Sequence, residues 1–322
     1  MKIVVLDGYA LNPGDLSWSG LAELGETVIY DRTAPGQLPE RAQGADMLFT
    51  NKTVLDEAAL ASLPGLRYIG VLATGYNVVD VQAAAKRGVV VTNIPGYGTN
   101  SVAQHAFALL LELCNRVGLH GEAVNAGEWQ RSAEWCFMKS PLTELAGKTM
   151  GIVGFGSIGR QVARIASAFG MNAFVPDRGK PLPAEFAAYV RAVPLERLLG
   201  EADVISLHCP LTPETQGLIR RETLQLMKPS ALLVNTARGA LIVEEDLAEA
   251  LNEGRIGGAA LDVLAQEPPK AGSPLIGAKN CIVTPHIAWG TKEARARLMD
   301  LAVQNAKAFL QGKPIHVVSP AN

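Results

Sequence analysis

The sequence has few cysteines, no strong excess of charge and no long apolar run. Its four cysteines, Cys114, Cys136, Cys209 and Cys281, show no CxxC spacing and no neighbouring His-rich segment, which predicts reduced thiols and no zinc site. No apolar stretch is long enough to span a bilayer, and the apolar run in Met1–Asp7 is too short for a signal peptide. We therefore expect a soluble cytoplasmic protein that binds neither a metal nor a membrane.

The charge balance also gives no indication of a nucleic-acid partner. The 322 residues include 29 Lys and Arg and 31 Asp and Glu, a formal net charge of −2. A nucleic-acid-binding chain commonly carries a strong basic excess. The length is enough for two domains of ordinary size.

The most informative stretch is Lys148–Gly159, KTMGIVGFGSIG, in which an apolar run leads into three spaced glycines and then into a segment of helical periodicity. Gly154 permits a tight turn, Gly156 lets the backbone approach a pyrophosphate, and Gly159 allows close packing of helix on strand. Asp177 follows the next apolar run, about twenty residues on, where a carboxylate can bind the adenosine ribose. A glycine turn without a ligand is the weaker alternative. The cofactor residues expected here are Gly154, Gly156, Ser157, Ile158, Gly159 and Asp177.

Short apolar runs alternate with helical segments along most of the chain, which predicts two doubly wound parallel α/β domains. The second is a Rossmann nucleotide domain at 99–289, inserted into a smaller flavodoxin-like substrate domain formed by 1–98 and 290–322. A long apolar helix at Ser101–Leu113, capped by Thr99 or Asn100, opens the nucleotide domain, and a helix at Thr291–Leu310 returns to the first domain. The expected strands lie at Ile3–Leu6, Thr27–Tyr30, Met47–Phe49, Tyr68–Leu72, Val89–Thr92, Gly151–Val153, Ala173–Val175, Val190–Val193, Val204–His208, Leu232–Asn235, Ala259–Leu261 and Ile282–Thr284.

Polar or turn-forming residues follow the ends of these strands, where open α/β sheets bind ligands. Arg238 is an unusual cation in the run LLLVNTARG, and its fork suits a carboxylate together with a neighbouring carbonyl oxygen; a solvated surface Arg is the alternative. The other strand-end residues are Asp177, Cys209, Pro210, Thr236, Ala237, Asp262 and His286.

Of the five histidines, only His208 and His286 lie at strand ends. Carbonyl reduction needs a cationic proton donor, and a carboxylate partner favours the charged imidazole. Two prolines hold Glu267 in an extended loop before the strand that leads to His286, so we pair these two residues and interpret His208 as structural. His105, in the apolar helix, is interpreted as a hydrogen-bonded core residue. His120 and His316 lie in segments expected at the surface.

Two further segments have less specific patterns. Ala73-Thr74-Gly75 follows a strand and can be a ligand loop, although a plain strand-to-helix turn is favoured when it is taken alone. The segment from His120 to Pro141 fits no regular period and carries Trp129, Trp135 and Phe137 among polar residues, so we expect a protruding loop that a partner chain covers.

The motifs ATGYNVVD, SVAQHAFALLLEL, ELAGKTMGIVGFGSIG, LHCPLTPET, VNTARG, ALDVLAQEP and TPHIAW occur in an order that resembles the D-isomer-specific 2-hydroxyacid dehydrogenases over essentially the whole chain. The resemblance implies a catalytic triad of Arg238, Glu267 and His286. It also implies that Asp262 contacts the nicotinamide carboxamide and that backbone N–H groups of the Ala73–Gly75 loop bind the substrate carboxylate. Residues of the matched motifs are therefore expected to bind NAD: Cys209, Pro210, Thr215, Thr236, Ala237 and Asp262.

The sequences of the individual motifs are most similar to the glycerate dehydrogenase branch. This similarity implies reduction of hydroxypyruvate to D-glycerate by NADH, with Arg238 and His286 contacting the substrate. Glyoxylate or another 2-oxo acid is the alternative substrate, and an NADH-sensing, non-enzymatic scaffold is a remote alternative. Asp177 favours NAD over NADP because a carboxylate repels a 2′-phosphate, although the neighbouring Arg178 could pair with one. The resemblance also implies a homodimer through the nucleotide domain and the loop at 118–141. Trp135 or Phe137 then lines the partner's active site or simply packs at the interface.

Overall fold

The computed structural model of the chain describes residues 1–319 and divides it into two compact units. One unit consists of Met1–Gly98 and the chain from Trp289 onwards, and the other of Thr99–Ala288. Each contains one parallel sheet with helices on both faces, as the sequence predicted. No helix in the described chain is both long and apolar enough to cross a membrane.

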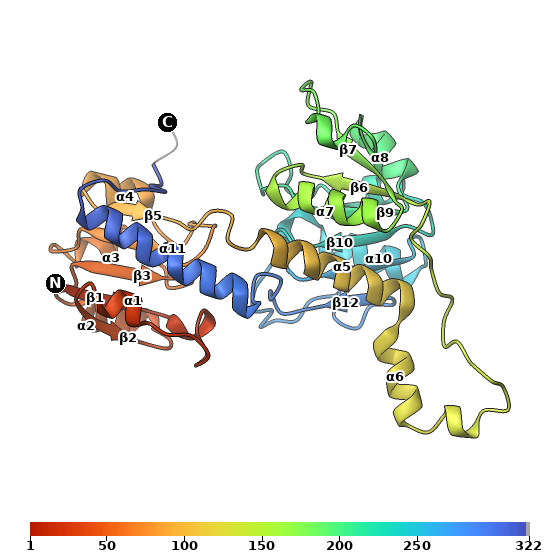
Figure 1. Ribbon diagram of the computed structural model, residues 1–322, viewed down its shortest axis with the longest axis horizontal. Coiled ribbons are helices and arrows are strands. Elements are labelled where there is room, and N and C mark those ends of the chain that lie inside the picture. The colour runs from red at the N-terminus through yellow and green to blue at the C-terminus, as the bar shows by residue number, and fades with distance from the viewer. Residues whose placement is uncertain (320–322) are drawn as a thin grey trace. The chain divides into compact units, whose positions relative to one another are not determined.

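The smaller unit contains a five-stranded sheet in the order β2-β1-β3-β4-β5, which is the flavodoxin-like order. Alternate residues of its strands face opposite layers: Ile3 and Val5 pack towards α11, whereas Val4 packs with residues of α2, α3 and α4. The expected return of the last helix is confirmed, because α11 packs against β4 and α1 of this sheet (Figure 1). The elements are β1 Lys2–Val5, α1 Ser19–Ala22, β2 Glu26–Ile29, α2 Leu38–Ala42, β3 Met47–Thr50, α3 Glu57–Ala61, β4 Tyr68–Val71, α4 Val81–Lys86, β5 Val90–Thr92 and α11 Lys292–Leu310.

The larger unit contains a seven-stranded sheet in the order β12-β11-β10-β9-β6-β7-β8, with the Rossmann reversal of strand order between β6 and β9. All its strand pairs are parallel. The elements are α5 Thr99–Asn115, α6 Val117–Asn125, β6 Thr149–Val153, α7 Ser157–Ala168, β7 Asn172–Pro176, β8 Val190–Val193, α8 Leu195–Glu201, β9 Val204–Leu207, α9 Arg221–Leu224, β10 Leu232–Asn235, α10 Glu244–Asn252, β11 Gly258–Leu261 and β12 Cys281–Val283.

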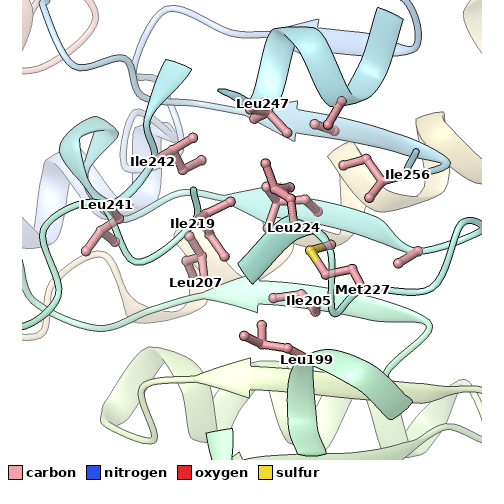
Figure 2. Close-up of a cluster of buried hydrophobic side chains, with 14 of the residues drawn as sticks. Leu199, Ile205, Leu207, Ile219, Leu224, Met227, Leu241, Ile242, Leu247 and Ile256 are labelled. Atoms are coloured by element: carbon pink, nitrogen blue, oxygen red, sulfur yellow. The ribbon is translucent and has the colours of Figure 1, made fainter. Parts of the chain in front are cut away.

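Two apolar cores hold this sheet between its helices. On one face, α5 and α7 pack side by side over residues such as Ile152 and Val234. On the other face, α8, α9 and α10 cover a cluster that includes Ile205, Leu207 and Leu224 (Figure 2). Leu241 and Ile242 belong to the same cluster, so their buried side chains anchor the turn that follows β10 to this core.

Two local expectations are corrected. Thr99 and Asn100 form the first turn of α5 and do not cap it from outside. The segment expected as an irregular loop begins with the helix α6, which includes His120, and continues through a short 3-10 turn at Trp129–Arg131. Figure 1 shows α6 and the chain after it extending from the rest of this unit. The sequence did not predict this helix because Ala123 is its buried residue, and a helix that buries so little shows no apolar stripe among its polar and aromatic residues.

Candidate active site

The glycine turn after β6 lies at the reversal of strand order, against the end of β9. Gly154 has φ +108°, and a Cβ on it would lie 2.4 Å from the carbonyl carbon of His208. A side chain at this position would therefore be both strained and blocked. The turn and the end of β9 form one continuous backbone surface at the carboxyl edge of the sheet.

The other two glycines meet different requirements. A Cβ on Gly159 would lie 2.0 Å from the carbonyl oxygen of Gly154, so this glycine allows α7 to pack against the turn. A Cβ on Gly156 would meet no atom within 4 Å, so the protein itself leaves that space open. α7 begins at Ser157, and the first-turn N–H groups of Ser157 and Ile158 have no intrahelical partner. This arrangement fits a pyrophosphate at the start of α7.

Asp177 directly follows β7, and its side chain is exposed at the same edge of the sheet. One carboxylate oxygen accepts a hydrogen bond from Gly179 N at 2.9 Å, which holds the side chain within its own turn. Arg178 beside it is also exposed. After β9, Thr215 Oγ1 donates to the carbonyl oxygen of Pro210 at 2.7 Å and so braces the turn that contains Cys209.

Arg238 follows β10 in a turn that Asn235 holds from both sides. The Asn235 side chain is fully buried, accepts a hydrogen bond from Ala237 N at 2.9 Å and donates to the Arg238 carbonyl at 2.8 Å. The exposed Arg238 guanidinium donates to the Ala237 carbonyl at 2.7 Å and makes no ion pair within residues 1–319. Its remaining N–H groups are available to an anion. Thr236 Oγ1 is buried in the same turn and has no hydrogen-bond partner among residues 1–319.

Gly239 brings this turn against the loop that carries Glu267. A Cβ on Gly239 would lie 1.9 Å from the carbonyl carbon of Leu264 and 2.3 Å from Ala265 N, so only glycine fits. Leu264 N then donates to Glu267 Oε1 at 2.9 Å. The close backbone contact therefore connects the position of Arg238 with that of the Glu267 carboxylate.

Glu267 Oε2 lies 2.6 Å from His286 Nδ1, and both side chains are about one-third exposed. The carboxylate orients the ring and engages Nδ1, which leaves Nε2 as the nitrogen that can transfer a proton. This is the pair that the sequence predicted. The structure thus brings the Glu267 carboxylate and the His286 imidazole together, and the turn that carries Arg238 packs through Gly239 against the Glu267 loop.

Asp262 directly follows β11, but its carboxylate is engaged by protein groups. Asp262 is 1% exposed and accepts hydrogen bonds from Thr284 Oγ1 and from the backbone N–H groups of Ile287 and Ala288. The expected contact of Asp262 with a nicotinamide carboxamide stays a prediction.

The loop after β4 in the smaller unit is anchored through its side chains and carbonyls. Thr74 Oγ1 donates to the Ile94 carbonyl at 2.7 Å, and Asn93 Nδ2 donates to the Thr74 carbonyl at 2.7 Å. Within the described residues the backbone N–H groups of Thr74 and Gly75 make no hydrogen bond. Two neighbouring donors are thus presented by a braced loop.

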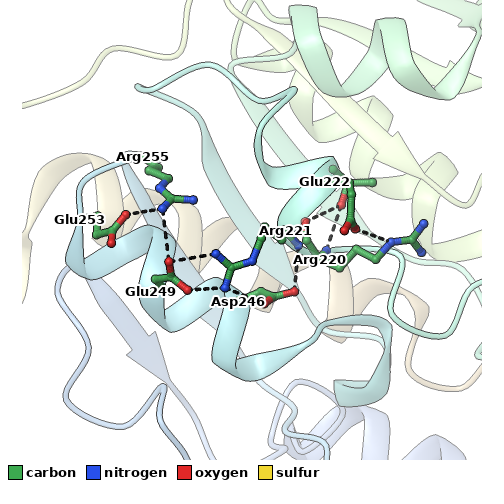
Figure 3. Close-up of polar contacts among 8 residues, drawn as sticks. Arg220, Arg221, Glu222, Asp246, Glu249, Glu253 and Arg255 are labelled. Atoms are coloured by element: carbon green, nitrogen blue, oxygen red, sulfur yellow. Dashed lines mark hydrogen bonds and ion pairs between the residues drawn. The ribbon is translucent and has the colours of Figure 1, made fainter.

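α10 supports the Glu267 loop from outside. Its first residue, Glu244, accepts hydrogen bonds from Ala265 N at 2.7 Å and from Ser273 Oγ. A surface network holds α10 to α9: Arg221 pairs with Glu249 at 2.5 Å, and Figure 3 shows the neighbouring pairs around it. Exposed pairs contribute little individually, but the network fixes the orientation of the helix.

Several of these supporting residues were missed or undervalued from the sequence. Asn235, Gly239 and Glu244 lie in or next to the motifs, but their roles depend on contacts with residues distant in the chain. His105 is hydrogen-bonded, as expected, but the sequence did not indicate its partners: Nε2 lies 3.1 Å from Thr284 Oγ1 and 3.4 Å from Asp262 Oδ1. His208 is partly buried, with its Nδ1 shielded from solvent, and this desolvation lowers its pKa to about 4, which suits a neutral structural residue.

The comparisons with known proteins agree with this geometry. Residues 107–288 match the model of the D-isomer specific 2-hydroxyacid dehydrogenase NAD binding domain. The chain is 52% identical to the hydroxypyruvate reductase of Blautia hydrogenotrophica, covering 99% of this chain and all of the relative. It is 41% identical to the glycerate dehydrogenase of Methylorubrum extorquens, with 98% of each chain covered. The apo-structure of D-lactate dehydrogenase from Escherichia coli is similar at a TM-score of 0.84 and 30% identity, covering 99% of this chain and all of that one.

Proposed function

The chain belongs to the D-isomer specific 2-hydroxyacid dehydrogenases, and from this membership we propose that it reduces hydroxypyruvate to D-glycerate with NADH. The chain is an NAD-dependent oxidoreductase of that family. The choice of hydroxypyruvate is supported by the 52% identity to a hydroxypyruvate reductase over the full chain. The observation that carries the chemistry is the 2.6 Å contact between Glu267 and His286, in the same unit as the glycine turn.

In the proposed mechanism, bound NADH supplies a hydride to the keto carbon of the substrate. His286 donates the proton from Nε2 to the carbonyl oxygen, while Glu267 holds the ring through Nδ1. A positioned acid of this kind contributes about 10²–10⁴-fold in rate. Arg238 binds the substrate's carboxylate or carbonyl oxygen and stabilises the developing negative charge. The free N–H groups of Thr74 and Gly75 support a role for the Ala73–Gly75 loop in carboxylate binding.

We propose the glycine turn as the pyrophosphate site and Asp177 as the ligand of the adenosine ribose. One oxygen of Asp177 makes no hydrogen bond to the described chain and can accept from a ribose hydroxyl. A 2′-phosphate at the same place would face this carboxylate, so NADH is expected to be preferred over NADPH. Cys209, Pro210, Thr215, Thr236 and Ala237 are proposed to complete the cofactor site from the neighbouring strand ends.

The experiment that tests this function follows the loss of NADH absorbance with hydroxypyruvate, glyoxylate, pyruvate and a branched 2-oxo acid. We expect the highest kcat/KM for hydroxypyruvate, with activity on NADPH clearly lower. His286→Ala should lower kcat by about 10²–10⁴-fold and leave a small residual rate, while the Kd for NADH stays near that of the wild type. A preference for glyoxylate would move the protein to the alternative substrate, and full turnover in His286→Ala would refute the mechanism.

We also propose a homodimer formed through α6 and the segment at 118–141. This segment exposes large apolar side chains, of which Trp135 is 88% and Met138 is 67% exposed, and such a surface is costly in water. Sedimentation velocity should show a dimer for the wild type and a monomer for Met138→Glu. Val54→Glu is the matched control, because Val54 is 60% exposed but lies in the other unit. That Trp135 or Phe137 reaches the partner's active site stays a prediction.

The cytoplasm is the compartment we propose. All four cysteines are free in the structure, and Cys136 is exposed, which suits a reducing environment.

A further inference from the structure

A polar cluster around the buried Asp262 lies next to His286 and joins three separate parts of the larger unit. At its centre is Asp262, whose Oδ1 accepts hydrogen bonds from Thr284 Oγ1 at 2.6 Å and from Ile287 N at 2.9 Å, and whose Oδ2 accepts from Ala288 N at 2.8 Å. His105 of α5 completes it, with Nε2 3.1 Å from Thr284 Oγ1 and 3.4 Å from Asp262 Oδ1.

The direction of each hydrogen bond in this cluster is fixed. The Thr284 hydroxyl has one hydrogen, which it donates to Asp262 at the short distance of 2.6 Å. Its oxygen must therefore accept from His105, which places a hydrogen on His105 Nε2. Burial alone would raise the pKa of Asp262, but the hydrogen bonds from His105, Thr284, Ala288 and Ile287 lower it below its ordinary value. The cluster is thus built around a carboxylate.

The backbone of His286 depends on this carboxylate. His286 has φ +55°, a left-handed conformation that is uncommon for a residue with a side chain. Its N–H donates to the carbonyl oxygens of Asp262 at 2.9 Å and Thr284 at 3.0 Å. The next two N–H groups donate to the Asp262 carboxylate. Glu267 therefore orients the ring of His286, whereas Asp262 fixes the backbone from which the ring extends.

α5 contributes two polar side chains to this arrangement, at the i, i+4 spacing that places them on one helix face. Ser101 Oγ donates to the Ala288 carbonyl at 2.6 Å, and His105 contacts Thr284 one turn later. Most of the helix is otherwise apolar and buried in the core. The face that carries Ser101 and His105 thus holds both ends of the segment at 284–288.

We propose that His105 is a positioning residue for the reductase reaction, acting through Thr284 and Asp262 on the backbone of His286. This inference rests on the proposed role of His286 as proton donor. The N–H of His105 keeps the Thr284 hydroxyl directed at Asp262, and Asp262 in turn keeps the donor nitrogen of His286 in place. A displacement of about 1 Å at a reacting group costs roughly 100-fold in rate, so the loss of His105 should be visible in turnover.

The test compares His105→Phe, which keeps a ring but removes the N–H, with His105→Gln, which retains a donor. We expect kcat for hydroxypyruvate to fall roughly 10- to 100-fold in His105→Phe, with an unchanged KM for NADH, and to recover largely in His105→Gln. His316→Phe, the same change at an exposed histidine of the other unit, should leave kcat as it is. A wild-type kcat in His105→Phe would overturn the proposal.

Two further measurements separate positioning from a merely structural role. In a His286→Ala background, His105→Phe should cost no further activity, whereas an equal additional loss would overturn action through His286. The imidazole NMR signal of His286 in ¹³C-histidine-labelled protein, assigned with His286→Ala, should shift in His105→Phe and return in His105→Gln. An unmoved signal would refute the positioning role. Because this signal needs no turnover, it tests the inference even if the wild type fails to reduce hydroxypyruvate, which would refute only the proposed function.

Discussion

Replacing Glu267 by Gln tests the proton donor through a change of a single atom. Glu267 Oε1 accepts from Leu264 N at 2.9 Å, and Oε2 lies 2.6 Å from His286 Nδ1. A glutamine side chain has one acceptor oxygen, and that oxygen would accept the hydrogen bond from the Leu264 backbone N–H. The NH2 group must then face Nδ1, which can only accept from it, so the ring is held neutral with its hydrogen on Nε2.

The size of the effect follows from the hydrogen bond that is lost. A hydrogen bond to a charged group contributes about 1.5–3 kcal/mol, which corresponds to about 10- to 150-fold in rate. Since both side chains are about one-third exposed, the lower part of that range applies. Steady-state reduction of hydroxypyruvate should show this loss in kcat, with an unchanged KM for NADH.

The matched control is Glu245→Gln, the same substitution at an exposed carboxylate on α10. It should leave kcat at its wild-type value. If Glu267→Gln behaves like this control, the carboxylate does not support the proton donor and the reasoning fails.

Three further predictions test other parts of the site. Gly239→Ala forces the Leu264 backbone to move by more than 1 Å, because the new Cβ would lie 1.9 Å from the Leu264 carbonyl carbon. We expect kcat to fall about 100-fold. The control Gly36→Ala, whose new Cβ would meet no atom within 4 Å, should keep the wild-type kcat. Gly156→Ala should change the free energy of unfolding, measured in urea, by no more than about 1 kcal/mol relative to the wild type. It should weaken NADH binding, measured by fluorescence titration, at least tenfold, since the added methyl group fills space that the cofactor needs. The pKa of His208 is lowered to about 4, so the unfolded state binds more protons than the folded state between about pH 6.5 and pH 4. The free energy of unfolding should therefore fall by about 3 kcal/mol as the pH drops through that window. In His208→Asn the free energy of unfolding should depend less on pH there, and an unchanged pH dependence would show that His208 is not held neutral by the fold.

Much of the fold could be predicted because buried parallel strands leave a clear pattern in the sequence. Runs such as Met150–Val153 and Leu232–Val234 are apolar throughout, since helices cover both faces of the sheet. In a parallel sheet the carboxyl ends share one edge, so the residues after each run, Arg238 and His286 among them, could be assigned to one region without coordinates. The double proline after Glu267 was enough to suggest its partner.

The rest depends on contacts that no local pattern encodes. His105 and Thr284 are 179 positions apart, and nothing in an apolar helix indicates which polar side chain will meet a distant strand end. The need for glycine at position 239 arises from a backbone more than twenty residues later in the chain. α6 was missed because it makes few contacts with the core: its buried side chain is Ala123, so the sequence shows no apolar stripe there.

The central claim is that Glu267 acts through His286, and a double-mutant cycle on kcat/KM for hydroxypyruvate tests it most directly. Residues that act as one unit lose activity in a strongly non-additive way. We predict that Glu267→Gln costs at least tenfold in the wild type but less than about threefold in a His286→Ala background. Equal losses in both backgrounds would show that the two residues act independently and would contradict the account.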